Sequence, residues 1–467
     1  MKSANQRLIL SFVLALITTF LFPPANAIAN GKWWDVVPEN EAPSYYYDSI
    51  LYSEIAPKLR EIEVNSNRVK VDVLAESAGG RNLLIATISD PETSDAQDMF
   101  QEILVNMTKD PEKALALIDS DSDFKVPVVI NGGTHGSEYT GVDAAVRVME
   151  YLAYDVSEEV QTILENVIVI INVVQNPDGR VSGTLQNSAN VDLDLDFMSQ
   201  SQPETKALVS LIKEWNPLVF LDLHNKLYSV TPTTYVPNTM VIEPSGPYHN
   251  PNYEYDLYIK WALFEAFSME DELFANTSET AIIPFRNGPC TTTQPQLTTS
   301  KYSMFHHTYG HTLETQYLDE RGVDAHFWAI KGALKYVVEN KKDMIRDQIQ
   351  AFRRGALDLP QQPIPEYILT ESNCNQYNDL TVQNFPVAYI IPENIAKYLL
   401  FNGVEVERTN DSFQYDEDNY PKGTYIVWMD QPRRVLANNF LEYRTDVVVI
   451  QGAFDIKTIK LNEASIK

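Results

Sequence analysis

Three side chains that could share one metal ion follow apolar runs in the first half of the chain. His135 and Glu138 lie three residues apart in Asn131-Gly-Gly-Thr-His135-Gly-Ser-Glu138, and His224 ends a later run in Leu221-Asp-Leu-His224. Two imidazoles and one carboxylate form catalytic zinc sites that leave one coordination position open. Zinc at such a site lowers the pKa of bound water to about 7 and polarises a carbonyl group. We therefore predict a catalytic site with one Zn2+ per chain.

The spacing of His135 and Glu138 suits a tight turn between a strand and a helix. A turn that contains glycine lets the imidazole and the carboxylate converge, whereas the alternating sides of a strand would separate them. Taken alone, this spacing is a weak signal, and in most sequences it is a chance pair at a helix start, where the glutamate complements the helix dipole. The position of His224, also at the end of an apolar run, favours the metal site.

A proton acceptor for this chemistry is expected from a further apolar run. Glu314 follows His311-Thr-Leu, and we predict that it takes a proton from the attacking water and returns it to the leaving group. The alternative is a strand-end carboxylate that pairs with a polar neighbour. His306, His307 and His311 crowd the same segment, but a fourth protein ligand would close the metal site, so we do not predict them as ligands.

These motifs resemble the zinc carboxypeptidase, or funnelin, family over about residues 45–332. The resemblance covers the paired ligands, the loop Asn176-Pro-Asp-Gly and the sequence Asp-Leu-His224. It implies that Asp192 supports the first zinc histidine, a role that suits the second N–H of a metal-bound imidazole. A surface aspartate is the alternative. The segment Glu76-Ser-Ala-Gly-Gly80-Arg81 resembles the family's entry motif, and the resemblance places Arg81 in the substrate groove. A structural role for Arg81 at a turn is the alternative.

The chain departs from the family where the substrate terminus would bind. After Asp192 the family continues Leu-Asn-Arg, whose Asn and Arg hold the terminal carboxylate, and here Asp194 and Leu195 stand in those places. A carboxylate near Asp194 would meet like charge. We therefore predict Asp194 as a substrate-binding residue that favours an amine, a hydroxyl or an amidated terminus.

Two further family residues have no secure counterpart. The family arginine that steadies the oxyanion aligns with Leu185, and Arg180 or Arg286 could replace it. The mobile tyrosine has two candidates, Tyr302 and Tyr309, of which we predict Tyr302 as the substrate-binding residue.

Short apolar runs alternate with helical patterns around these motifs. The runs are 126–130, 167–174, 218–222 and 311–313. Helical patterns include 145–154 and one that opens at Pro203. We predict an α/β fold with a mixed, mostly parallel sheet layered by helices, in which reactive groups gather beyond the carboxyl ends of the strands. Residues 231–300, rich in Pro, Thr, Asn and Tyr, are expected to form an irregular lid around one helix at 255–273.

Four segments are expected along the chain: a signal peptide at 1–27, a catalytic domain at 28–356, a proline-rich linker at 357–366 and a small α/β domain at 367–467. The signal peptide predicts a secreted or periplasmic protein, and an uncleaved anchor is the alternative. No later segment is apolar enough for stable membrane insertion. Cys290 and Cys374 could bridge the two domains or remain thiols.

The charge balance excludes some partners. The chain has 36 Lys and Arg against 64 Asp and Glu, a net charge of -28, so it repels nucleic acid and anionic lipid. The resemblance implies instead a peptide or peptide-like substrate. We expect a zinc-dependent, metallocarboxypeptidase-like hydrolase of peptide or amide bonds. The alternatives are a zinc amidase or deacylase acting on cell-wall or modified peptides, and a zinc-containing binding protein with weak catalysis.

Overall fold

The structure of the protein is a computed structural model. It describes residues 32–42, 44–120, 123–225, 229–231, 234–235, 238–245, 253–283, 297–363, 385–415, 417–442 and 459–461. The predictions for the signal peptide, for Cys290, Cys374 and Arg286, and for residues 364–366 of the expected linker lie outside these residues.

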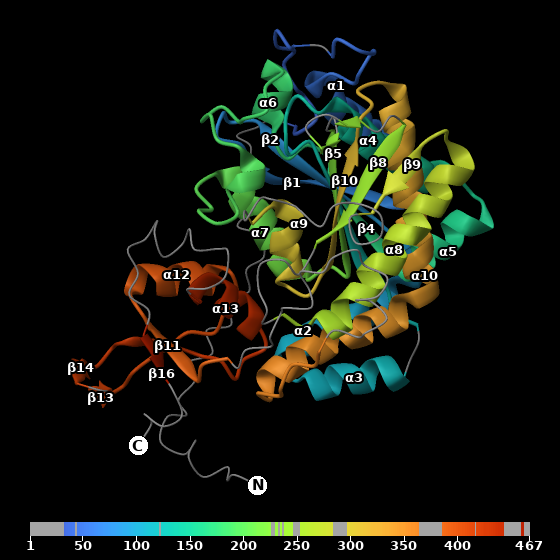
Figure 1. Cartoon of the computed structure of the whole chain (residues 1–467). Helices are drawn as coiled ribbons and strands as arrows, with labels where there is room; N and C mark the ends of the chain where they lie inside the picture. Colours follow the sequence, from blue (N-terminus) through green and yellow to red (C-terminus); the bar gives the residue numbers. More distant parts are fainter. Residues whose placement is uncertain are drawn as a thin grey trace.

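A mixed sheet of eight strands forms the centre of the larger body (Figure 1), in the order β1-β2-β4-β3-β5-β10-β8-β9. Its strands are β1 (Val69–Glu76), β2 (Asn82–Ile88), β3 (Val126–Gly132), β4 (Val167–Asn172), β5 (Val219–Asn225), β8 (Thr239–Pro244), β9 (Thr280–Ile282) and β10 (Tyr309–Thr315). The four central strands β4, β3, β5 and β10 run parallel. Because helices cover both faces, β3, β4 and β5 are buried along their whole length. The predicted α/β fold is confirmed.

Helices form a layer on each side of this sheet. The long helix α10 (Glu320–Ala356) contacts α2 (Ser94–Lys109), α3 (Pro111–Ser120), α4 (Tyr139–Tyr154), α5 (Glu158–Asn166) and α8 (Tyr255–Asn276). On the other side lie α7 (Pro203–Trp215) and α9 (Thr299–Met304) (Figure 1). A Cβ atom at Gly332 of α10 would lie 2.5 Å from the Ser268 carbonyl oxygen, so this glycine permits the close crossing of α10 and α8.

The irregular lid expected for residues 231–300 is wrong where the structure describes this stretch. β8 pairs antiparallel with β10, β9 extends the same sheet, and α8 packs against α10. The composition, rich in Thr and Tyr, suggested a loop. β8 is a strand because it pairs with β10, which follows later in the sequence, so the composition of this stretch alone does not reveal it. A separate two-stranded ribbon is formed by β6 (Ser229–Thr231) and β7 (Thr234–Tyr235).

The C-terminal unit is built on a second sheet, in the order β12-β15-β11-β16. Its elements are β11 (Ala388–Ile391), α12 (Glu393–Phe401), β12 (Glu407–Arg408), β13 (Phe413–Tyr415), β14 (Asp418–Tyr420), β15 (Tyr425–Trp428), α13 (Arg434–Leu441) and β16 (Ile459–Leu461). Ile391, Leu399 and Leu436 belong to the same buried apolar cluster as the core of the larger body. The unit is therefore packed against that body, beside α7 and α9 (Figure 1).

Two further helices and two 3-10 turns complete the part that the structure describes. These are α1 (Tyr52–Asn65), α6 (Pro177–Ser182), η1 (Pro91–Thr93) and η2 (Leu193–Leu195). Among the described residues, no helix is long and apolar enough to cross a membrane.

Candidate metal centre

The turn after β3 gives His135 and Glu138 their positions. Gly133 has a φ of +66°, which favours glycine. A Cβ atom at Gly136 would lie 2.0 Å from the carbonyl carbon of Gly179, so any other residue at 136 would push the two loops apart. The Glu138 amide then donates to the His135 carbonyl oxygen at 3.1 Å, and Glu138 forms the N-cap of α4.

Three candidate ligand atoms converge on one point. Nδ1 of His135 lies 2.9 Å from Oε1 of Glu138, and Nδ1 of His224 lies 3.1 Å from Oε2 of Glu138. The two Nδ1 atoms are 3.3 Å apart. Ligands at tetrahedral angles around zinc, with bonds of about 2.1 Å, lie about 3.4 Å from one another. The residue types and the spacing of these atoms therefore fit one zinc ion. The three side chains would move slightly apart to admit it, because their present distances are a little shorter than those around zinc.

The other ring nitrogen of each histidine points at a carboxylate. Nε2 of His135 donates to Oδ1 of Asp192 at 3.3 Å, and Nε2 of His224 lies 3.0 Å from Oδ2 of Asp222. Each carboxylate fixes the tautomer that leaves Nδ1 free for a metal and makes the imidazole a stronger ligand. Asp192 lies where the sequence predicts it. Asp222 was missed, although it precedes His224 by two residues on β5 and so shares its face.

Asp222 is itself held by a buried polar network. Its Oδ1 accepts from Nδ2 of Asn131 at 2.8 Å and from Oγ1 of Thr134 at 3.2 Å. Asn131 ends β3 beside β5, and it also donates to Gln175 at 2.8 Å. All four side chains are fully buried. The orientation of His224 is therefore set from two neighbouring strands and the loop between β3 and α4.

The electrostatics of the cluster suit a cation. Burial alone would lower the pKa of His135, but hydrogen bonds to Asp192 and Glu138 raise it to about 10. Burial would raise the pKa of Glu138, but the two imidazoles lower it to about 2. The carboxylates thus stabilise positive charge on the histidines, and a bound metal ion would replace their protons.

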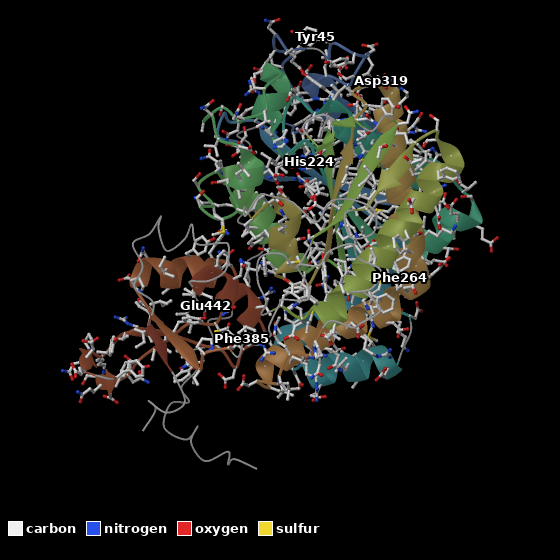
Figure 2. All side chains as sticks on the ribbon, in the orientation of Figure 1. Tyr45, His224, Phe264, Asp319, Phe385 and Glu442 are labelled. Atoms are coloured by element: carbon white, nitrogen blue, oxygen red, sulfur yellow. The ribbon has the colours of Figure 1, made fainter. Side chains whose placement is uncertain are left out.

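Glu314 lies beside the cluster on the next strand. In the parallel pair of β10 and β5, Glu314 is directly opposite His224. Paired residues of neighbouring strands point to the same face and are about 4.8 Å apart. His224 itself lies inside the larger body, below the exposed Tyr45 at its top (Figure 2). The structure therefore places Glu314 beside His224, one of the three candidate ligands.

Asp194 also reaches the cluster, from the side of Asp222. Carboxylate oxygens of Asp194 and Asp222 and a ring nitrogen of His224 lie within 4.8 Å of one another. Oδ1 of Asp194 accepts from the backbone N–H and from Oγ1 of Thr299, both at 3.0 Å. Thr299 is the first residue of α9, so Asp194 joins the metal centre to that helix.

Other predicted site residues are held away from the cluster. Arg81 forms two hydrogen bonds with Glu39 and a third, at 2.8 Å, with Asp178. These contacts are those of a structural residue at the turn after β1. Tyr302 is fully buried, and its hydroxyl donates to Oδ1 of Asn402 in the C-terminal unit at 2.6 Å.

Arg180 and Tyr309, the reserve candidates, are also engaged elsewhere. Arg180 is buried, and its guanidinium donates to Asp143 at 2.9 Å and to the Ile50 carbonyl oxygen at 2.6 Å. The Tyr309 hydroxyl donates to the Met344 carbonyl oxygen at 3.1 Å. Arg180 therefore anchors the segment before α1 and does not face the cluster.

Comparison with known proteins adds a family match. Residues 58–255 match the model of a family described as zinc carboxypeptidase. The match contains His135, Glu138, Asp192 and His224, whereas Glu314 lies beyond it. None of the curated proteins matches the chain.

Three solved structures show the range of the likeness. A metallo-carboxypeptidase from Burkholderia cenocepacia has 17% identity over 61% of this chain and 68% of its own, with a TM-score of 0.43. Thrombin activatable fibrinolysis inhibitor has 15% identity over 66% and 78%, with a TM-score of 0.46. Carboxypeptidase A from Helicoverpa armigera has 18% identity over 65% and 74%, with a TM-score of 0.41. Identities and TM-scores this low carry no assignment by themselves. The family assignment therefore rests on the match of residues 58–255 to the zinc carboxypeptidase model.

Proposed function

We propose that this protein is an exported metallopeptidase that hydrolyses a peptide or amide bond with the help of Glu314. The proposal starts from the match of residues 58–255 to the zinc carboxypeptidase family. The observation that carries the proposal is the convergence of His135 Nδ1, Glu138 and His224 Nδ1. Family membership supports zinc dependence and a hydrolase. The mechanism, the export and the substrate are our inference.

The described residues divide the chemistry between them. A zinc ion bound by the three ligands would supply an open coordination position and polarise the carbonyl group of the substrate. Asp192 and Asp222 hold the imidazoles in the ligating tautomer. Glu314, opposite His224 on β10, takes the proton from the attacking water and passes it to the leaving amine.

Asp194 gives the proposal its specificity. It stands where the family resemblance implies a residue that grips the terminal carboxylate of the substrate, and it places a negative charge beside Asp222 and His224. Arg81 and Arg180 are bound to Asp178 and Asp143, so neither supplies the missing cation. We expect amidated or amine-bearing substrates to be cleaved better than free-acid peptides of the same sequence.

One set of kinetic measurements tests the proposal. The purified protein should contain about one zinc per chain, and a chelator should abolish its hydrolysis of a panel of peptides in matched free-acid and amidated forms. Glu314→Gln should keep the zinc and lose turnover by about a hundredfold or more, because it removes the proton acceptor but no ligand. Arg321→Gln, an exposed change on α10, is the matched control and should retain both.

Each outcome has a clear meaning. Zinc with no hydrolysis of any peptide would favour a zinc-containing binding protein. Unchanged turnover by Glu314→Gln would remove this residue from the mechanism. A preference for free acids that is lost in Arg286→Ala would show that an arginine outside the described residues holds the substrate terminus.

A further inference from the structure

Asn402, at the C-terminal end of α12, connects two segments of the larger body. It is fully buried. Its Oδ1 accepts from Nε2 of Gln200 at 2.8 Å and from the hydroxyl of Tyr302 at 2.6 Å, and its Nδ2 donates to Oε1 of Gln200 at 3.1 Å. A buried amide with its oxygen and nitrogen both bonded fixes the distance between its partners.

The first partner, Gln200, ends the segment that carries Asp192 and Asp194. Gln200 has a φ of +47°, an uncommon value for a residue with a side chain, and it is buried. Its conformation is therefore maintained by its contacts, and its amide group bonds to Asn402 and to the Phe197 carbonyl oxygen of its own segment. The hydroxyl of Tyr398, also on α12, donates to the Met198 carbonyl oxygen at 2.9 Å and holds the same segment.

The second partner, Tyr302, lies on α9, the helix whose first residue binds Asp194. Within α9 the Tyr302 amide donates to the Thr298 carbonyl oxygen at 2.8 Å, so Tyr302 and Thr299 are parts of one rigid turn. Ser300 of the same turn shares a hydrogen bond of 2.7 Å with Thr312, which lies on the same face of β10 as Glu314. Moving α9 would therefore move the groups that contact Asp194.

A chain of hydrogen bonds sets the direction of the Tyr302 hydroxyl. Arg433 of the C-terminal unit donates to Nδ1 of His306, so Nε2 of His306 carries the proton and donates to the Tyr302 oxygen at 2.9 Å. Tyr302 must then donate to Asn402. The two contacts with the C-terminal unit thus act on the same side chain of α9.

We propose that Asn402 is a positioning residue for Asp194, so that the C-terminal unit sets the pocket for the end of the substrate. Asn402 joins the segment that carries Asp194 to helix α9. The same segment and helix also meet at Asp194, which accepts hydrogen bonds from Thr299 of α9. The inference rests on the proposed function only in taking Asp194 to face the substrate.

Hydrogen exchange of the full-length protein tests this positioning without a substrate. Asn402→Ala should speed amide exchange in residues 192–201 and 297–304, because each segment loses a buried hydrogen bond to Asn402. The ratio of kcat/KM for amidated over free-acid peptides should fall by about fivefold, as expected for the loss of one or two buried hydrogen bonds.

Two further variants keep the test sharp. Tyr302→Phe removes one hydroxyl and should give a smaller change in the same two segments, even if Asn402→Ala does not fold. Lys213→Met is the matched control, because it deletes another hydrogen bond to the C-terminal unit, at 3.2 Å to the Phe401 carbonyl oxygen, one residue from Asn402. It should not change exchange near Asp194.

Equal exchange in Tyr302→Phe, Lys213→Met and the wild type across both segments would overturn the proposal. Because exchange needs neither zinc nor turnover, it still decides the role of Asn402 if the protein proves to hydrolyse nothing. A changed exchange pattern with an unchanged substrate ratio would show that Asn402 orders the segments but does not set specificity, and this too would overturn the proposal.

Discussion

At the scale of single residues, the candidate metal centre has two aspartates behind its histidines. Asp192 and Asp222 hold the outer nitrogens of His135 and His224, and thereby present both Nδ1 atoms to the same point. The Asn225 amide performs a related task, because it donates to Oε2 of Glu138 at 3.0 Å. His135 and Glu138 are thus each held from behind by a hydrogen bond, and His224 by a close contact with the Asp222 carboxylate.

Asp222→Asn should weaken zinc binding by about 10- to 100-fold, because it removes the negative charge that lies 3.0 Å from Nε2 of His224. Competition with a chromophoric chelator measures this directly. Asp178→Asn, which alters a buried aspartate bonded to Arg81 and not to a ligand, is the control and should bind zinc as the wild type does. Equal affinity of the two variants would deny Asp222 its role.

Residue types and spacing predicted that His135, Glu138 and His224 lie together, because short motifs at strand ends keep their geometry locally, and the family resemblance added Asp192. Their role as ligands stays a prediction. The role of Asp222 could also have been predicted, since alternation on a strand places it beside His224. The location of Tyr302 could not have been predicted from the sequence. Its partner Asn402 is 100 residues away in sequence and belongs to the other unit, so no local pattern records the contact.

At the scale of elements, the edge of the sheet is where prediction from sequence failed. The runs that became β3, β4 and β5 are buried on both faces, and these runs and the short one in β10 were found from sequence. β8 and β9 lie within a stretch rich in Pro, Thr, Asn and Tyr that resembles a loop, and they join the sheet because β8 pairs with β10 and β9 pairs with β8. Strands of this kind depend more on tertiary pairing than on their own residues.

Glu279, beside the edge strand β9, gives this region a dependence on pH. Burial raises its pKa from an ordinary value of 4.5 to about 8. The folded state therefore holds the proton more tightly than the unfolded chain, and stability is lost as the pH rises through 8. Glu279→Gln should raise the free energy of unfolding by about 2 to 4 kcal/mol at pH 9 and leave it unchanged at pH 4.

Urea unfolding at both pH values checks this prediction. Glu61→Gln, an exposed change on α1, is the control and should show no such difference. A Glu279→Gln variant that gains no stability at pH 9 relative to pH 4 would contradict the buried, protonated carboxyl group.

At the scale of the whole molecule, buried charges join the two units. Glu254, next to the first residue of α8, accepts from Arg354 of α10 at 2.9 Å and from Arg434 of α13 at 2.8 Å. Glu254 and Arg434 are both nearly inaccessible to solvent. Such a cluster fixes the docking of the C-terminal unit, because neither partner can be buried alone.

Glu254→Gln should lower the free energy of unfolding by about 3 to 5 kcal/mol, since it leaves the buried Arg434 without its carboxylate. Glu393→Gln, which breaks a surface pair with Lys397, should have little effect on stability and serves as the control. Chemical unfolding followed by tryptophan fluorescence compares them. A similar small effect of both changes would mean that apolar packing alone docks the unit.

The anchoring of the segment before α1 bears on how the chain acquires its fold. Arg180, on α6, binds the Ile50 carbonyl oxygen, and the Val181 carbonyl oxygen accepts from the Ala42 amide at 2.8 Å. Synthesis delivers Ala42 and Ile50 before α6, and their partners on α6 follow more than a hundred residues later. Closing so long a loop is slow compared with local helix formation. This early segment is therefore among the last to settle, and until then it is open to proteases and chaperones.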